Sequence, residues 1–180
     1  LLPKRRRPAL AVAFSADGRR VFSGGQDGPI MCWDVDEVRD GVALVDPGDQ
    51  VNVIACSPLD ARLAFGCEDG RIGLLDGHEG GTPHYLEGHA DDVNALAFSS
   101  DGSLLAFAAT DGSADMLELS SGEMLLQADA GVLGLGLAWI GGQYYDWTGS
   151  RVARRLDGAV PLTEVGDRRR CSPAAPPPAP

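Results

Sequence analysis

The residues best suited to chemistry gather in the segment DGHEGGTPHYLEGH, which carries all three histidines of the chain, His78, His84 and His89. Glu79 and Glu87 lie among them. Imidazole and carboxylate groups are common ligands of zinc and other transition metals. The histidines are six and five residues apart, which is not the closely spaced ligand pair typical of a metal site. We therefore expect no metal here.

The chain carries none of the short motifs of common enzyme classes, such as a Walker loop, GxSxG or HExxH. The segment GVLGLGLAW (131–139) has GxG spacing, but no strand–helix–strand pattern surrounds it, so a dinucleotide site is not expected. Asp91 and Asp92 form an acidic pair, which we interpret as surface charges on a loop. The sequence therefore predicts no enzyme, no cofactor and no small-molecule substrate.

A repeat organises the chain. Asp-Gly pairs begin at residues 27, 69 and 111, which are 42 residues apart. Two further landmarks recur at this interval. One is Trp33-Asp34, which returns as Leu75-Asp76 and Leu117-Glu118. The other is Phe14-Ser15, which returns as Cys56-Ser57 and Phe98-Ser99. Self-similarity at such a period is typical of architectures in which each unit stacks on the next.

Each unit predicts four short strands. In the third unit we expect strands at 93–98, 103–109, 113–119 and 123–128, because VNALAF alternates like a half-buried strand. SSDG, TDG and SSGE are turn signals. A fourth unit is degenerate, with LGLAWIGG, QYYDW and SRVARRLD offering three strands. No useful helical periodicity is present, so the expected class is all-β.

The pattern GHADDVNALAFSSDGSLLAFAATDGSADMLEL (88–119) resembles a WD40 repeat, and AVAFSADGRRVFSGGQDGPIMCWD (11–34) resembles one more closely. The resemblance covers residues 9 to about 163 and implies a β-propeller of four-stranded blades. It also implies that a blade is stiffened by a hydrogen-bonded chain of His, Ser or Thr, Asp and Trp. The residues that match the structural positions of the motif are Ser23, Asp27, Trp33, Asp34, Asp69, Asp76, Gly88, His89 and Asp111.

No unit contains all four residues of this hydrogen-bonded set. The first has its Ser, Asp and Trp, with Arg5 at the His position. The second keeps only Asp69, and the third keeps His89 and Asp111. An aspartate buried without partners is costly, so we expect Asp69 and Asp111 to accept hydrogen bonds from turn amides.

The repeat divides the chain into a basic arm, a set of blades and a tail. We expect the arm at 1–8, the blades at 9–164 (about 9–46, 51–86, 93–128 and 135–163) and a disordered Arg/Pro-rich tail at 165–180. The family resemblance implies more blades, usually seven, in a closed ring. Two alternatives follow: a part of a larger propeller, completed by further sequence or by another chain, or an unusual small ring. We favour the first, because natural proteins avoid bare sheet edges.

The repeat predicts a non-catalytic scaffold for protein–protein interaction within an intracellular assembly. The candidate interaction residues are Asp49, Asp91, Asp92, Tyr144, Tyr145, Trp147, Arg168, Arg169 and Arg170. An RNA-associated subunit that uses the Arg clusters at 5–7 and 168–170 is the alternative, although a net charge of −11 argues against a phosphate-binding surface. A degenerating remnant of a propeller is a third possibility.

Cysteine usage and hydropathy predict the compartment. Cys32, Cys56 and Cys67 lie in strand-like runs without a CxxC pair. We therefore expect these cysteines to be small buried apolar residues, and the protein to be in a reducing compartment. The apolar runs are too short for a membrane span, and no signal peptide is recognised at the start. We expect a cytoplasmic or nuclear location and no membrane partner.

Overall fold

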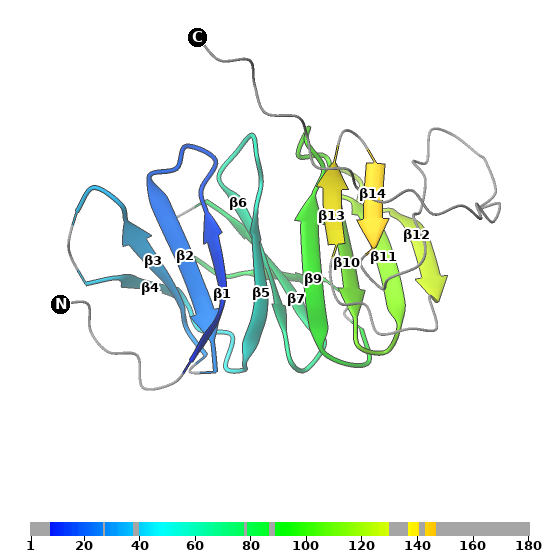
Figure 1. The fold of residues 1–180 in the computed structure, drawn as a ribbon, viewed down its shortest axis with the longest axis horizontal. Helices are drawn as coiled ribbons and strands as arrows, with labels where there is room; N and C mark the ends of the chain where they lie inside the picture. The colour runs from blue at the N-terminus through cyan, green and yellow to red at the C-terminus, as the bar shows by residue number, and fades with distance from the viewer. Residues whose placement is uncertain are drawn as a thin grey trace, which may run out of the picture.

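The computed structural model describes residues 8–26, 28–37, 40–77, 79–86, 89–129, 137–140 and 143–146. Every regular element in this part of the chain is a β-strand. The strands form three four-stranded antiparallel sheets and one two-stranded hairpin (Figure 1). The all-β class and the four-stranded unit predicted from the repeat are therefore confirmed.

Each sheet is one blade, in which consecutive strands pair in chain order. Blade 1 contains β1 (Ala9–Phe14), β2 (Arg20–Gly25), β3 (Ile30–Asp34) and β4 (Val42–Val45). Blade 2 contains β5 (Val51–Cys56), β6 (Arg62–Cys67), β7 (Ile72–Asp76) and β8 (His84–Leu86). Blade 3 contains β9 (Val93–Phe98), β10 (Leu104–Ala109), β11 (Ser113–Glu118) and β12 (Met124–Asp129). The hairpin contains β13 (Leu137–Ile140) and β14 (Gln143–Asp146). In blade 3, β10 and β12 begin one residue later than expected and β11 ends one residue earlier.

The backbone repeats at the same 42-residue step as the sequence. One set of amides donates across the first two strands of each blade: Gln26 to Pro8, Glu68 to Gln50 and Thr110 to Asp92. A second set closes the first hairpin: Ser15 to Arg20, Ser57 to Arg62 and Ser99 to Leu104. The three blades are therefore copies of one hydrogen-bonding pattern.

The glycines of the recurring Asp-Gly pairs occupy the turn between the second and third strands. Gly28, Gly70 and Gly112 have φ angles of 85°, 84° and 88°. This left-handed region is unfavourable for residues with a Cβ atom and open to glycine. The turn chemistry therefore explains why glycine returns at this point in each of the three blades.

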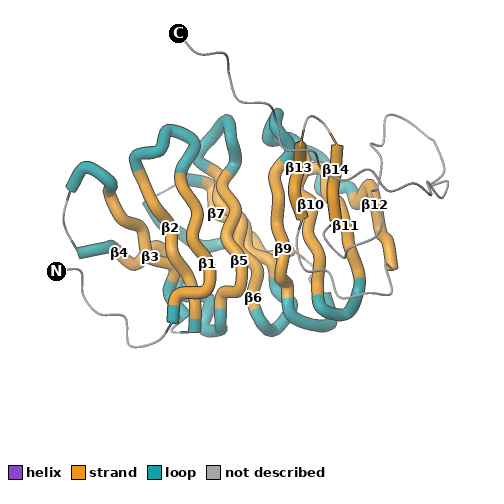
Figure 2. Tube along the Cα trace, viewed as in Figure 1, coloured by secondary structure: helices purple, strands orange, loops and turns teal. Residues whose placement is uncertain are grey.

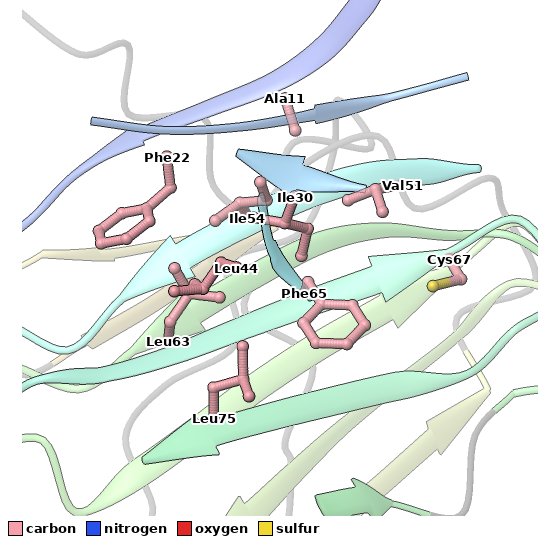
Figure 3. Close-up of a cluster of buried hydrophobic side chains, with 10 residues drawn as sticks. All are labelled: Ala11, Phe22, Ile30, Leu44, Val51, Ile54, Leu63, Phe65, Cys67 and Leu75. Atoms are coloured by element: carbon pink, nitrogen blue, oxygen red, sulfur yellow. The ribbon is translucent and has the colours of Figure 1, made fainter. Parts of the chain in front are cut away.

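The core lies between the blades. Figure 3 shows one part of it, between blades 1 and 2: Ala11, Phe22, Ile30, Leu44, Val51, Ile54, Leu63, Phe65, Cys67 and Leu75. The core between blades 2 and 3 contains Ala64, Ile72, Val93, Leu96, Phe98, Leu105, Phe107 and Leu117. Burial of these apolar side chains stabilises each blade against the next.

The first strands of successive blades lie beside one another, with β1 against β5, β5 against β9 and β9 against β13 (Figure 2). Among the described residues the sheets form an open arc and do not close into a ring (Figure 1). Within the same residues, no helix has the length and apolar character that a membrane crossing needs.

The cysteines differ in burial. Cys67 is buried, as expected, whereas Cys32 and Cys56 are only half-buried, because they pack at the margin of the core between blades 1 and 2. Burial raises the pKa of the Cys56 thiol to about 12. It also raises the pKa of Cys67 to about 12. Thiols with such a raised pKa are poor nucleophiles near neutral pH.

Candidate interaction face

The loops that link one blade to the next lie at the same edge of the sheets as the turns between the second and third strands. The His89 amide donates to the Gly70 carbonyl at 3.0 Å. The Ala90 amide donates to Asp111 Oδ2 at 3.2 Å, and the Asp69 amide donates to Asp49 Oδ2 at 2.9 Å. These bonds join loops and turns into one surface. We call it the blade-linker face and define it as residues 46–50, 68–71, 89–92 and 110–113.

Carboxylates dominate the blade-linker face. Its acidic residues are Asp46, Asp49, Glu68, Asp69, Asp91, Asp92 and Asp111. Arg71 is the only lysine or arginine within these segments, and it forms an ion pair with Asp69. The face therefore carries a strong excess of negative charge, which attracts cationic partners and repels polyanions.

In blade 2, Arg71 joins the turn to the linker on the blade-linker face. Its Nε donates to the Asp69 carboxylate, and its Nη2 donates to the Pro47 carbonyl at 3.1 Å. The guanidinium also lies 5.2 Å from the centre of the Tyr85 ring, a cation–π distance. The hydrogen bond to Asp69 raises the pKa of Arg71. Burial raises the pKa of Tyr85, and the Arg71 charge partly opposes that rise.

In blade 3, His89 of the linker contacts Ser113, which is the repeat counterpart of Arg71. Its Nδ1 lies 2.6 Å from Ser113 Oγ, 3.8 Å from Asp111 Oδ2 and 3.9 Å from Asp115 Oδ2. Its ring lies against Phe107, with centroids 5.2 Å apart in a T-shaped arrangement. Burial favours a higher pKa for Asp111, but hydrogen bonds from Ser113 and Ala90 and the nearby His89 together lower it.

Ser113, His89 and Asp111 are the residue types of a hydrolase triad, but their geometry differs from one. In a triad the serine and the aspartate bind opposite ring nitrogens, so that a proton passes through the imidazole. Here Ser113 and both carboxylates are on the Nδ1 side, and Nε2 is buried without a hydrogen-bond partner. The cluster ties the linker to the turn and has no relay through the ring.

Blade 1 uses a different contact. Trp33 Nε1 donates to Ser23 Oγ at 2.8 Å, and Gly41 packs so closely on the indole that a Cβ there would lie 2.7 Å from it. Asp34 Oδ1 accepts the Asp36 amide at 2.9 Å. Asp27, which the resemblance places beside Ser23 and Trp33, lies outside the described residues.

The opposite edge of the sheets, which we call the hairpin face, carries the turns between the first and second strands. Arg62 Nη2 crosses from blade 2 to blade 3 and donates to the Gly102 carbonyl at 2.6 Å. Hydrogen bonds lower the pKa of Asp60 to about 2, and the bond from the Arg62 side chain has the largest effect. Asp76 lies at this edge, at the exposed end of β7. The two faces thus use different contacts between the blades.

The structure brings only some of the candidate residues together. Asp49, Asp69, Asp91, Asp92, His89 and Asp111 lie on the blade-linker face. Asp69 Oδ1 accepts the Arg71 amide at 3.1 Å, and Asp111 Oδ1 accepts the Ser113 amide at 2.8 Å. Tyr144 and Tyr145 belong to β14. Gly88, Trp147, Arg168, Arg169 and Arg170 lie outside the described residues.

Sequence reasoning missed Arg71, Tyr85, Ser113 and Asp115. One signal was present: Arg71 and Ser113 both stand two residues after a turn aspartate and are 42 residues apart. An aspartate at a turn commonly accepts the amide two residues further on, and the side chain of that residue then lies beside the carboxylate. Tyr85 and Asp115 had no comparable signal, because their contacts come from packing between strands.

Comparisons with known proteins agree with this architecture. The sequence model of the family described as "WD domain, G-beta repeat" matches residues 7–34 and 80–114. The chain is 35% identical over 74 residues to "Transcription factor unc-37" of Caenorhabditis elegans, covering 41% of this chain and 12% of that protein. It is 37% identical over 60 residues to "U3 small nucleolar RNA-associated protein 4 homolog" of Homo sapiens, covering 33% of this chain and 9% of that protein. The chain thus spans only a small part of the length of these relatives.

Two solved structures are similar in fold. The computationally designed Ika4 protein matches with a TM-score of 0.71 and 24% identity, covering 86% of this chain and 96% of that chain. The computationally designed Ika8 protein matches with a TM-score of 0.67 and 26% identity, covering 81% of this chain and 44% of that chain. The similarity to the Ika4 protein supports the fold alone.

The stacked four-stranded sheets define the class of the molecule as a β-propeller-type repeat protein. Within that class, the chain is similar to WD40-repeat proteins in two stretches, residues 7–34 and 80–114, which match the family model.

Proposed function

We propose that the chain is a non-catalytic scaffold that binds other proteins through the blade-linker face. The observation that carries the proposal is the concentration of carboxylates on this face, with Arg71 already paired to Asp69. WD40 repeats generally serve as interaction modules, which supports the same reading. A partner with a basic segment fits best, because complementary charge speeds association and favours correct partners.

The proposed face is preorganised for binding. Linker residues are tied to neighbouring turns by the bonds from His89 to Gly70 and from Asp69 to Asp49. Asp91 Oδ1 also accepts the Asp92 amide at 2.9 Å, which orders that loop. A loop already held in one conformation loses less entropy when a partner binds.

The test is a comparison of captured proteins from cells that make the chain. The variant Asp91→Asn with Asp92→Asn removes two charges from the blade-linker face and keeps amide oxygens as hydrogen-bond acceptors. The control, Asp36→Asn with Asp76→Asn, removes the same charge at exposed positions on the hairpin face. We expect partners to be lost only from the first variant. Equal capture by both variants and the unchanged chain would exclude the blade-linker face.

A second candidate function is association with RNA in the nucleus. It is supported by the names of the two relatives, a transcription factor and a small nucleolar RNA-associated protein. The acidic blade-linker face opposes phosphate, so this function would depend on the Arg clusters at 5–7 and 168–170. Their replacement by Ser should abolish binding to a single-stranded RNA oligonucleotide, and binding to the unchanged chain should fall steeply with salt. Absent or salt-independent binding would exclude it.

A further inference from the structure

Asp-Gly bonds recur along the chain, and such bonds have a covalent chemistry of their own. The glycine nitrogen can attack Cγ of the preceding aspartate, because a residue without a Cβ atom lets the backbone fold back on itself. The new N–Cγ bond closes a succinimide ring, the amide proton is lost, and one carboxylate oxygen leaves as water. Hydrolysis of the ring takes up water again and gives either aspartate or isoaspartate, in which the main chain runs through the side-chain carboxyl group. The reaction therefore needs no oxidant, reductant or cofactor.

Two kinds of contact in the folded chain decide how readily an Asp-Gly bond reacts. A glycine amide that donates a hydrogen bond must break it before its nitrogen can attack. A carboxylate that accepts hydrogen bonds is held in place and in its ionised form, which does not lose an oxygen as water. A hydrogen bond of ordinary net strength therefore slows the reaction about fivefold, and two such bonds slow it about thirtyfold.

The Asp-Gly bonds of four turns are protected in both ways. In these turns the glycine amide donates to the carbonyl three residues earlier, at 2.9–3.3 Å: Gly18, Gly70, Gly102 and Gly112. The preceding aspartates also accept hydrogen bonds. Asp101 Oδ1, for example, accepts the Ser103 amide at 3.1 Å and Ser99 Oγ at 2.5 Å. We expect these four bonds to react slowly in the folded chain.

The bond between Asp40 and Gly41 differs from the bonds in these turns. It lies directly before β4, and the Asp40 side chain is exposed. Among the described residues, none accepts a hydrogen bond from the Gly41 amide and none donates one to the Asp40 carboxylate. Neither kind of protection is therefore present at this bond within the described part of the chain.

The bond between Asp76 and Gly77 provides a comparison within the same chain. Asp76 is exposed at the end of β7, as Asp40 is before β4. The Gly77 amide, however, donates to the Ala61 carbonyl at 3.2 Å. The difference in reactivity between Asp40 and Asp76 therefore measures the effect of the amide hydrogen bond.

Gly41 is also a packing residue of blade 1. A Cβ atom built on it would lie 2.7 Å from Trp33 Cδ2, so its backbone is in close contact with the indole ring. The same ring donates from Nε1 to Ser23 Oγ at 2.8 Å. Isoaspartate adds the Cβ atom of Asp40 to the main chain and so moves Gly41 relative to the ring.

We propose that the Asp40–Gly41 bond is a site of spontaneous isoaspartate formation in the folded chain, and that this rearrangement weakens the packing of Gly41 on Trp33. The site is independent of the scaffold function, because Asp40 lies outside the blade-linker face.

The test is ageing of the folded chain near neutral pH in water labelled with heavy oxygen. Each succinimide that hydrolyses takes up one heavy oxygen, so mass spectrometry of peptic peptides locates the aspartates that have reacted. Methylation of the aged peptides by a protein isoaspartate methyltransferase, with S-adenosylmethionine as methyl donor, identifies isoaspartate. We expect Asp40 to be labelled about fivefold faster than Asp76 and about thirtyfold faster than Asp101 and Asp111.

The control is the same ageing in guanidinium chloride, where the chain is unfolded. All of these aspartates precede glycine, so they should then be labelled at similar rates. Labelling of Asp40 in the folded chain that is absent, or no faster than that of Asp101, would overturn the site. An equal preference for Asp40 in the unfolded chain would also overturn it, because the preference would then come from the local sequence and not from the fold.

The variant Asp40→Glu tests the effect on blade 1. Glutamate would have to close a larger and less favourable ring, so this variant should not rearrange at this position. After ageing, the natural chain should show an additional melting transition at lower temperature, and the aged variant should melt like the fresh one. Isoaspartate at Asp40 without a change in melting would overturn the weakened contact with Trp33.

Discussion

Replacing Gly70 by Ala should disturb the joint between blade 2 and the linker of blade 3. Gly70 has a φ of +84°, a conformation that costs other residues about 1 kcal/mol. Its new Cβ would lie 2.1 Å from the His89 carbonyl oxygen, and such overpacking costs about 1–3 kcal/mol. Displacing the linker also breaks the bond from the His89 amide to the Gly70 carbonyl, worth about 1 kcal/mol. We expect the free energy of unfolding to fall by about 3–5 kcal/mol.

The control is Gly18→Ala, because Gly18 has a φ of +70° and no atom within 4 Å of its built Cβ. This variant should lose only the conformational part, about 1 kcal/mol. Urea denaturation followed by circular dichroism measures both variants against the unchanged chain. If Gly70→Ala proved no more destabilising than Gly18→Ala, the turn and the linker would not be the rigid unit described above.

Three other changes test separate contacts. Trp33→Phe and Ser23→Ala should each destabilise the chain. A double-mutant cycle by urea denaturation should give a coupling energy of about 1 kcal/mol for the hydrogen bond between Trp33 and Ser23. Additive effects would show that this bond contributes nothing. Hydrogen bonds from serine side chains lower the pKa of Asp101 to about 2. The ionised Asp101 carboxylate therefore contributes fully to stability above its ordinary pKa, and this contribution is lost as the pH falls toward 2. Asp101→Asn should flatten the fall of the urea midpoint between pH 5 and pH 2.5, and an unchanged profile would refute this. Cys67, whose pKa burial raises to about 12, should resist iodoacetamide at pH 8 in the folded chain and react in urea, as peptide mass spectrometry would show; equal modification in both conditions would contradict its burial.

The fold could be predicted from the sequence because local signals agree with the global repeat. The 42-residue spacing specifies equivalent positions, and Asp-Gly pairs specify turns that require a positive φ, as Gly70 and Gly112 show. Alternation in VNALAF then specifies the strand that follows the linker. These signals depend on single residues and their near neighbours, so they are readable without a tertiary structure.

The contacts of the blade-linker face could not be predicted in the same way. Pro29, Arg71 and Ser113 occupy one repeat position with no shared chemistry. Arg71 reaches the Pro47 carbonyl and the Tyr85 ring only because both lie beside the turn in the folded blade. The resemblance placed a serine or threonine on the second strand, where blade 3 has Phe107, and the hydroxyl that binds His89 comes from β11 instead.

The first strand of blade 1 shows the same limit, since Val12 is 68% exposed and Phe14 is 63% exposed. Both side chains are apolar, and the residues at the same repeat positions in other blades, Ile54 and Phe98, are each 7% exposed. Exposure of this kind depends on what packs against a strand in the folded protein, which strand alternation does not encode. Comparison of equivalent positions in the three blades reveals it.

The most direct test of the scaffold function is the affinity of one captured partner, measured by calorimetry at two salt concentrations. We expect Asp91→Asn with Asp92→Asn to weaken binding by about tenfold at low salt, since two lost charge interactions of about 0.7 kcal/mol each amount to that factor. The difference should shrink at high salt, where exposed charges are screened. Asp36→Asn with Asp76→Asn should bind like the unchanged chain. Equal weakening by both variants, or by neither, would contradict binding through the blade-linker face.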